Sequence, residues 1–185
     1  MKAVSRALLL CCLSVMPAMT LAQATPPARP PVGSQVPPAQ IYGRLLSNFE
    51  KEIVDLADAM PEEKYNFVPS QGEYKGVNNF SAQVKHIAGA NYEFFGKTAN
   101  ADPSAGAAVE KLTSKADIMK ALRESFLVAH KAIDGMTAQN AFEMTANGTR
   151  AGSASIALAH MMDHYGQLVE YLRLNGIIPP ASRKK

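Results

Sequence analysis

The chain has 185 residues, which suits one domain, and its 47% of hydrophobic residues excludes a chain that is disordered throughout. The formal net charge of +3 falls to +1 without Lys2 and Arg6, which lie in a segment that we expect to be removed. This balance gives no electrostatic reason to expect nucleic acid or an anionic membrane surface as a partner.

The first 24 residues have the pattern of a secretory signal peptide. Lys2 and Arg6 supply the positive start, residues 7–16 form the apolar centre, and Ala22 and Ala24 have the spacing of a cleavage site. The apolar run is shorter than the about 20 residues that a transmembrane helix needs. We therefore expect export to the periplasm or the medium, cleavage near Ala22–Ala24 and no membrane insertion of the mature protein.

Both cysteines of the chain, Cys11 and Cys12, lie in this segment, so the mature protein would contain none. Their loss excludes disulfides, thiolate nucleophiles and zinc sites made from cysteine. Any metal ion would therefore need nitrogen or oxygen ligands.

Composition divides the remaining chain into three parts. Residues 25–38 are rich in proline, which favours extended polyproline II and predicts a linker. Residues 39–178 are expected to form the folded domain, beginning next to Pro38, a residue that suits the first position of a helix. Residues 179–185 end in Arg-Lys-Lys and are expected to be a solvated basic tail.

Four segments of the domain have apolar residues spaced three or four apart, as in amphipathic helices. They cover about residues 39–60, 79–97, 114–135 and 153–175. The candidate N-caps of the last three are Asn78 or Asn79, Thr113 or Ser114, and Ser153. No convincing strand competes with them, and segment 142–149 with its Asn-Gly pair is expected to be a turn. Apolar stripes of this width must be buried against one another, so the sequence predicts an all-α fold, a four-helix bundle.

Two histidines four residues apart lie in the fourth predicted helix. At about 100° per residue, His164 lies about 40° around the helix axis from His160 and one turn further along. Leu168 and Tyr171 fall on the same side, so both imidazoles are expected to project from the core-facing arc. This spacing occurs in helical zinc sites, and the alternative is a pair of neutral, hydrogen-bonded histidines.

A third histidine, His86, lies at the border of the apolar arc of the second predicted helix. Burying an imidazole without a partner is unfavourable, so three histidines that face one interior favour a shared divalent cation. Separate hydrogen-bonded histidines are the alternative to this metal site. The fourth histidine, His130, is off the main apolar row of the third helix and is expected to be solvated.

Three further residues lie near the expected site. Asp163 is placed to orient a ligand imidazole, with a solvated charge as the alternative. Gln167 is placed to hydrogen-bond a metal-bound water or another helix. Glu93, two turns beyond His86, is only a geometric candidate for a general base, so no catalytic residue is assigned.

Three motifs together resemble the DinB superfamily, also called YfiT-like metalloenzymes. Met-Pro-Glu-Glu-Lys-Tyr-Asn-Phe occupies 60–67, Phe-Ser-Ala-Gln-Val-Lys-His-Ile-Ala occupies 80–88, and His-Met-Met-Asp-His-Tyr-Gly-Gln-Leu occupies 160–168. Each motif is weak alone, whereas their order and separation are specific. The likeness covers about residues 40–178.

The resemblance implies an up-down-down-up four-helix bundle with a long crossover. It also implies metal ligands at His86, His160 and His164, with nickel or zinc as the usual ion and the remaining coordination positions open to water. Characterised relatives include thiol-dependent transferases that use bacillithiol and a mycothiol-dependent maleylpyruvate isomerase. Such thiols belong to a reducing cytosol, so their use is not transferred to a chain with an export signal.

These observations favour a metal-dependent enzyme, a hydrolase or transferase acting on a small molecule that the sequence does not identify. A non-catalytic, metal-binding or stress-associated bundle is the first alternative. A bundle without metal, whose histidines bond to one another, is the second. Each is compatible with a homodimer formed through a helix face.

Overall fold

The computed structural model describes residues 29–146 and 148–184, in two units that divide after Ser34. In the first unit, the described residues 29–34 contain a turn in which the Ser34 amide donates to the Pro31 carbonyl at 3.1 Å. The predicted signal peptide, 1–24, and the first residues of the predicted linker lie outside the described residues. The second unit contains the helices and strands described below.

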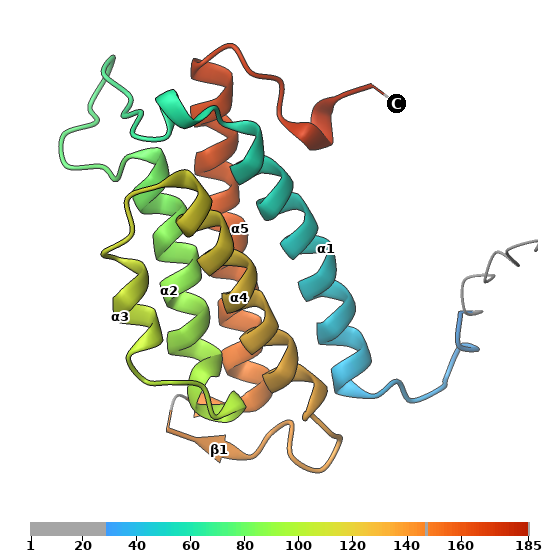
Figure 1. Ribbon diagram of the computed structural model, residues 1–185. Coiled ribbons are helices and arrows are strands. Elements are labelled where there is room, and N and C mark those ends of the chain that lie inside the picture. Colours follow the sequence, from blue (N-terminus) through green and yellow to red (C-terminus); the bar gives the residue numbers. More distant parts are fainter. Residues whose placement is uncertain (1–28, 147, 185) are drawn as a thin grey trace, which may run out of the picture. The chain divides into compact units, whose positions relative to one another are not determined.

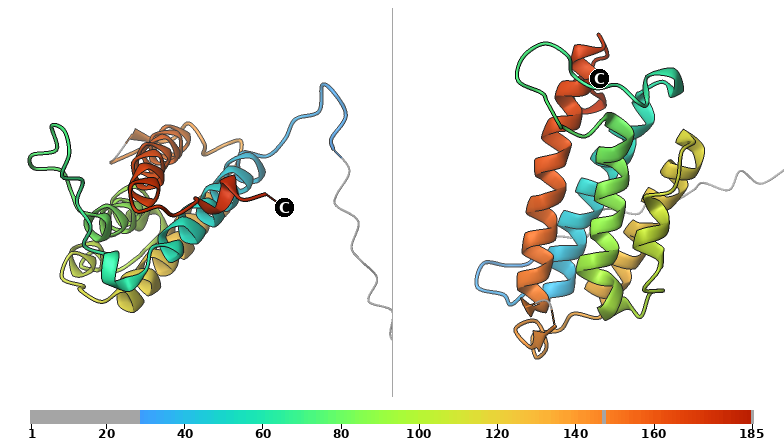
Figure 2. Two further views of the ribbon diagram at one scale, coloured as in Figure 1. Left: turned by 90° about the horizontal axis from the view of Figure 1, so that it is seen from above. Right: turned by 90° about the vertical axis from the view of Figure 1, so that its left-hand side faces the viewer.

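The described part of the second unit is mostly helical, which confirms the prediction of an all-α protein. Its long helices are α1 Pro38–Ala59, α2 Phe80–Ala99, α4 Lys115–Asp134 and α5 Arg150–Leu174. Helices α1 and α2 each pack against both α4 and α5. Figure 1 shows the four lying side by side, and the end-on view in Figure 2 shows them around a common centre.

A short helix, α3 (Ala105–Val109), lies along α2 in the connection from α2 to α4. In Figure 1, α1 and α5 run in one direction and α2 and α4 in the other, so this connection returns along the length of α2. Gly106 lets α3 approach closely, because a Cβ at this position would lie only 3.3 Å from the Cβ of Tyr92. The sequence did not predict α3.

Side-chain caps begin two of the long helices where the sequence placed candidates. Asn79 accepts a hydrogen bond from the Ala82 amide at 2.7 Å and caps α2. Ser114 accepts from the Asp117 amide at 3.1 Å and caps α4. Each cap satisfies an amide that the helix itself leaves without a partner.

The start of α5 differs from the prediction. Thr149, and not Ser153, is its cap, because the Thr149 hydroxyl accepts from the Gly152 amide at 3.0 Å. Two short antiparallel strands, β1 (Met144–Thr145) and β2 (Gly148–Thr149), lead into the helix where a simple turn was expected. Strand β2 holds Thr149 in an extended conformation, so the Thr149 hydroxyl can accept a hydrogen bond from the first turn of α5.

Side chains from the four long helices form one apolar core. The largest of those that are fully buried include Leu46, Ile53, Phe80, Ile87, Leu122, Phe126, Ile133, Met161 and Leu168. Burial of such side chains is the main force that holds amphipathic helices together. None of the described helices combines the length and the apolar character needed to span a bilayer.

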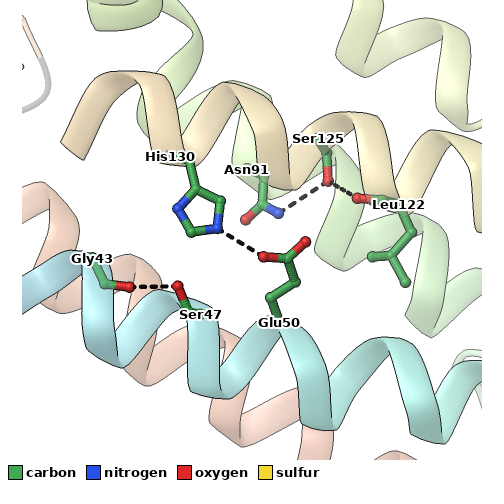
Figure 3. Close-up of polar contacts among 7 residues, drawn as sticks. All are labelled: Gly43, Ser47, Glu50, Asn91, Leu122, Ser125 and His130. Atoms are coloured by element: carbon green, nitrogen blue, oxygen red, sulfur yellow. Dashed lines mark hydrogen bonds and ion pairs between the residues drawn. The ribbon is translucent and has the colours of Figure 1, made fainter. Parts of the chain in front are cut away.

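Two polar contacts join α4 to its neighbours (Figure 3). Asn91 of α2 donates to the Ser125 hydroxyl at 3.0 Å, and Ser125 donates to the Leu122 carbonyl at 2.7 Å. His130 lies 2.7 Å from a carboxylate oxygen of Glu50 on α1, and only 26% of its side chain is exposed. The prediction of a solvated His130 is therefore wrong: the packing of α1 on α4 brings a carboxylate to the flank where the ring lies.

Candidate metal centre

Helices α2 and α5 bring the three predicted histidines together. His86 comes from α2, and His160 and His164 lie one turn apart on α5. The Nε2 atom of His160 is 3.1 Å from the Nε2 atom of His86 and 3.1 Å from that of His164. Ligand nitrogens of all three rings lie within 4.8 Å of one another. We call these three residues the histidine triad.

The triad lies at the surface between the two helices, and not in the interior of the bundle as expected. His86 is exposed, and His160 and His164 are partly buried. Buried residues of α5 before and after the pair of histidines include the apolar Ala157 and Leu168. The histidines lie at the edge of this apolar contact, so the triad is supported on one side and open to solvent on the other.

The distances within the triad suit a single metal ion. Two histidine nitrogens bound to zinc at about 2.0–2.1 Å are about 3.3 Å apart at the tetrahedral angle, close to the two separations of 3.1 Å. Without an ion, a proton on His160 Nε2 could make a hydrogen bond of good geometry to only one of the two neighbouring nitrogens, that of His86 or that of His164. A cation would accept a lone pair from all three rings, and neutral imidazoles are good ligands for zinc, nickel and copper.

Two glutamines and an aspartate form a series of hydrogen bonds that begins at His164. The Nδ1 atom of His164 is 2.6 Å from Gln83 Oε1, and Gln83 Nε2 donates to Gln167 Oε1 at 2.7 Å. Gln167 Nε2 then donates to Asp163 at 2.9 Å. Gln83 is only 3% exposed and was not among the predicted site residues. Its place on the apolar arc, between Phe80 and Ile87, was the available signal, because a buried amide needs partners.

Burial keeps two of the imidazoles neutral. Burial, and then the charge on His86, lowers the pKa of His160, while Asp163 and Glu93 act in the opposite direction. Burial, followed by charge on His160 and His86, lowers the pKa of His164 from 6.5 to about 4. Both rings are therefore unprotonated at neutral pH, the form that binds a metal ion.

The lowered pKa of His164 predicts that the metal-free protein loses stability in weak acid. The unfolded chain takes up a proton on this residue near pH 6.5, whereas the folded protein resists it until about pH 4. Because the unfolded state binds more protons in this window, the free energy of unfolding should fall as the pH falls through it. Urea denaturation in EDTA at several pH values measures this effect. His164→Gln should have a smaller pH slope than the wild type, and an equal slope would contradict the assignment.

A cavity of about 780 Å³ lies between α2 and α3 and has His86 in its wall. Glu93, Lys97 and Glu110 also line it, together with several glycines and alanines. The small side chains leave the space open, while the charged ones supply polar groups around it. A small molecule held there would lie next to one member of the triad.

These features define a helical protein with three histidines gathered between two of its helices. Compared with known protein families, residues 45–168 match the DinB superfamily. The match covers more than half of the chain and contains the whole triad. The chain therefore belongs to the DinB superfamily, as its motifs indicated. A search of the curated proteins found no match.

Proposed function

We propose that this protein is an exported, divalent-metal-dependent hydrolase or transferase, with His86, His160 and His164 as the metal ligands. The observation that carries the proposal is the approach of three Nε2 atoms, with two separations of 3.1 Å, from two different helices. Export rests on the signal-like residues 1–24. Zinc or nickel is the proposed ion, supported by three imidazole ligands and by the family.

We further assign the long helices to an up-down-down-up bundle in which the segment containing α3 is the long crossover. The helix directions in Figure 1 support this assignment, as does the packing of α1 and α2 against both α4 and α5. In such a bundle α2 and α5 are neighbours, which is the arrangement that the triad requires.

The exposure of the triad favours catalysis over a purely structural ion. A structural zinc site has four protein ligands and is closed, whereas a catalytic one has three and keeps a position open. When bound, such an ion supplies Lewis-acid chemistry, polarising a water molecule or a substrate oxygen. The cavity beside His86 would hold the substrate.

Glu93 is the residue of this cavity best placed to handle a proton. It is exposed, it lines the cavity with His86, and its charge acts on His160. A carboxylate in this position would accept a proton from a molecule that approaches the triad. Lys97, one turn further along α2, would contact an anionic group of the same molecule.

One observation favours a second role, a metal ion that serves only to hold the bundle together. The triad takes His86 from α2 and the other two histidines from α5, so a bound ion would link two helices. Binding to the folded state alone would then raise stability. This alternative predicts the same ligands and no reaction.

The experiment is a metal analysis followed by an activity screen. We expect protein purified without a His-tag to contain about one divalent ion per chain by mass spectrometry. We expect an ester or a small electrophile to react, with the rate lost in EDTA and restored by the metal. Absence of metal after incubation with zinc and nickel would contradict both roles. Stoichiometric metal without any metal-dependent reaction would favour the structural role.

A further inference from the structure

A continuous chain of hydrogen bonds runs from His164 to the protein surface. It passes from His164 Nδ1 to Gln83 at 2.6 Å, from Gln83 to Gln167 at 2.7 Å, and from Gln167 to Asp163 at 2.9 Å. This series of hydrogen bonds crosses from α5 to α2 and returns to α5. Gln83 is its only member on α2, and it is buried.

Asp163, at the exposed end, determines which atom donates in every hydrogen bond of this series. The carboxylate of Asp163 has only acceptor atoms, so the amide nitrogen of Gln167 must face it and donate. The amide oxygen of Gln167 is then left to accept from the nitrogen of Gln83. The oxygen of Gln83 is consequently the atom that faces His164 Nδ1, and this nitrogen must carry the proton.

Tyr171 provides a second, weaker argument for the same orientation of Gln83. The Tyr171 hydroxyl donates to the Asn78 carbonyl at 2.8 Å, which leaves its oxygen free to accept. Burial raises the pKa of Tyr171, and the Gln83 side chain opposes this rise, which agrees with an amide nitrogen, and not an amide oxygen, facing the hydroxyl.

We propose that Gln83 is a positioning residue that holds His164 as its Nδ1–H tautomer, with the Nε2 lone pair directed at the centre of the triad. In a neutral imidazole either nitrogen can carry the proton. A proton on Nε2 would point into the triad, where His160 Nε2 lies 3.1 Å away, and would block a cation. Gln83 disfavours this Nε2–H tautomer already in the metal-free protein. The effect of Gln83 on metal binding rests on the proposed metal site.

The first test measures the tautomer directly and needs no metal. Protein labelled with 15N-histidine is studied in EDTA at neutral pH by long-range proton–nitrogen NMR, with His164 assigned by comparison with His164→Gln. We expect Nδ1 to be protonated and Nε2 unprotonated in the wild type. In Gln83→Met, which keeps the length and removes the acceptor, we expect the Nε2–H form to appear. A wild-type His164 protonated on Nε2 would overturn the proposal.

The second test measures zinc affinity by competition with a chromophoric chelator. We expect Gln83→Met to bind zinc about 10–100-fold more weakly, the usual cost of removing a partner of a ligand histidine. Gln83→Glu, which restores an acceptor oxygen, should recover most of the affinity. Asn91→Leu is the matched control, because it removes another buried amide of α2 whose partner is Ser125 on α4 (Figure 3). Its affinity should be unchanged.

The outcomes separate this inference from the proposed function. If the wild type shows the expected tautomer but binds no zinc, the metal site fails while the assignment of the tautomer stands. If zinc binds equally well to the wild type and to a folded Gln83→Met, the positioning role is wrong and the metal site stands. If Asn91→Leu weakens binding as much as Gln83→Met, the effect is general destabilisation and the positioning role is again wrong.

Discussion

The double variant His160→Ala/His164→Ala should lose zinc binding almost completely. It removes two of the three histidines whose ligand nitrogens lie within 4.8 Å of one another, and it leaves exposed His86 alone. Because removing even a partner of a ligand lowers metal affinity about 10–100-fold, we expect a loss of more than a hundredfold here. Mass spectrometry of the purified protein and chelator competition measure the loss.

His130→Ala is the control for the double variant. This residue is a histidine of the same bundle, but it contacts Glu50 between α1 and α4 and is not part of the triad (Figure 3). It should retain the wild-type metal content. EDTA should lower the melting temperature of the wild type and of His130→Ala, and should leave that of the double variant unchanged. Equal metal content in all three proteins would show that the ion binds elsewhere.

Phe126→Ala should cause a large loss of stability without a direct effect on the triad. Phe126 of α4 is fully buried, and α4 packs against both α1 and α2. Truncating a buried phenylalanine costs about 3–5 kcal/mol, because apolar burial is lost and a cavity remains. The free energy of unfolding from urea titration measures this change.

The neighbouring residue provides the control for this substitution. Leu127 is 66% exposed although it adjoins Phe126 on the same helix. Leu127→Ala should change the free energy of unfolding by no more than about 0.5 kcal/mol, as is usual for surface positions. Equal losses for the two variants would mean that α4 faces the core differently from the arrangement described above.

The sequence was most informative where the signal is local. Apolar residues three or four apart identified the long helices, and the candidate caps of two of them included the residues that the structure shows, Asn79 and Ser114. Both signals depend only on backbone geometry and on amides within one turn. The prediction failed at Ser153, because the cap of α5 is decided by the pairing of β1 with β2, which positions Thr149.

The candidate site was predicted only in part for the same reason. The spacing of His160 and His164 is local, whereas the approach of His86 joins residues 74 positions apart. The place of His86 at the border of its apolar arc made it a candidate, and the motifs of the superfamily supported it, but neither signal gives the contact itself. Gln83 was missed because nothing in its own helix shows that its amide faces His164. His130 was misjudged because its partner, Glu50, comes from another helix.

The sequence by itself determined that this protein is helical, narrowed the start of two of its helices to one of two adjacent residues, and showed that two histidines share one face of the last helix. These properties follow from interactions within a few residues, which any chain with this sequence would make. Only the tertiary structure decided that the triad is open to solvent, that Gln83 connects it to Asp163, and that His130 is paired with Glu50. Each of these depends on which helices are neighbours, and that choice is made by burial of the whole core.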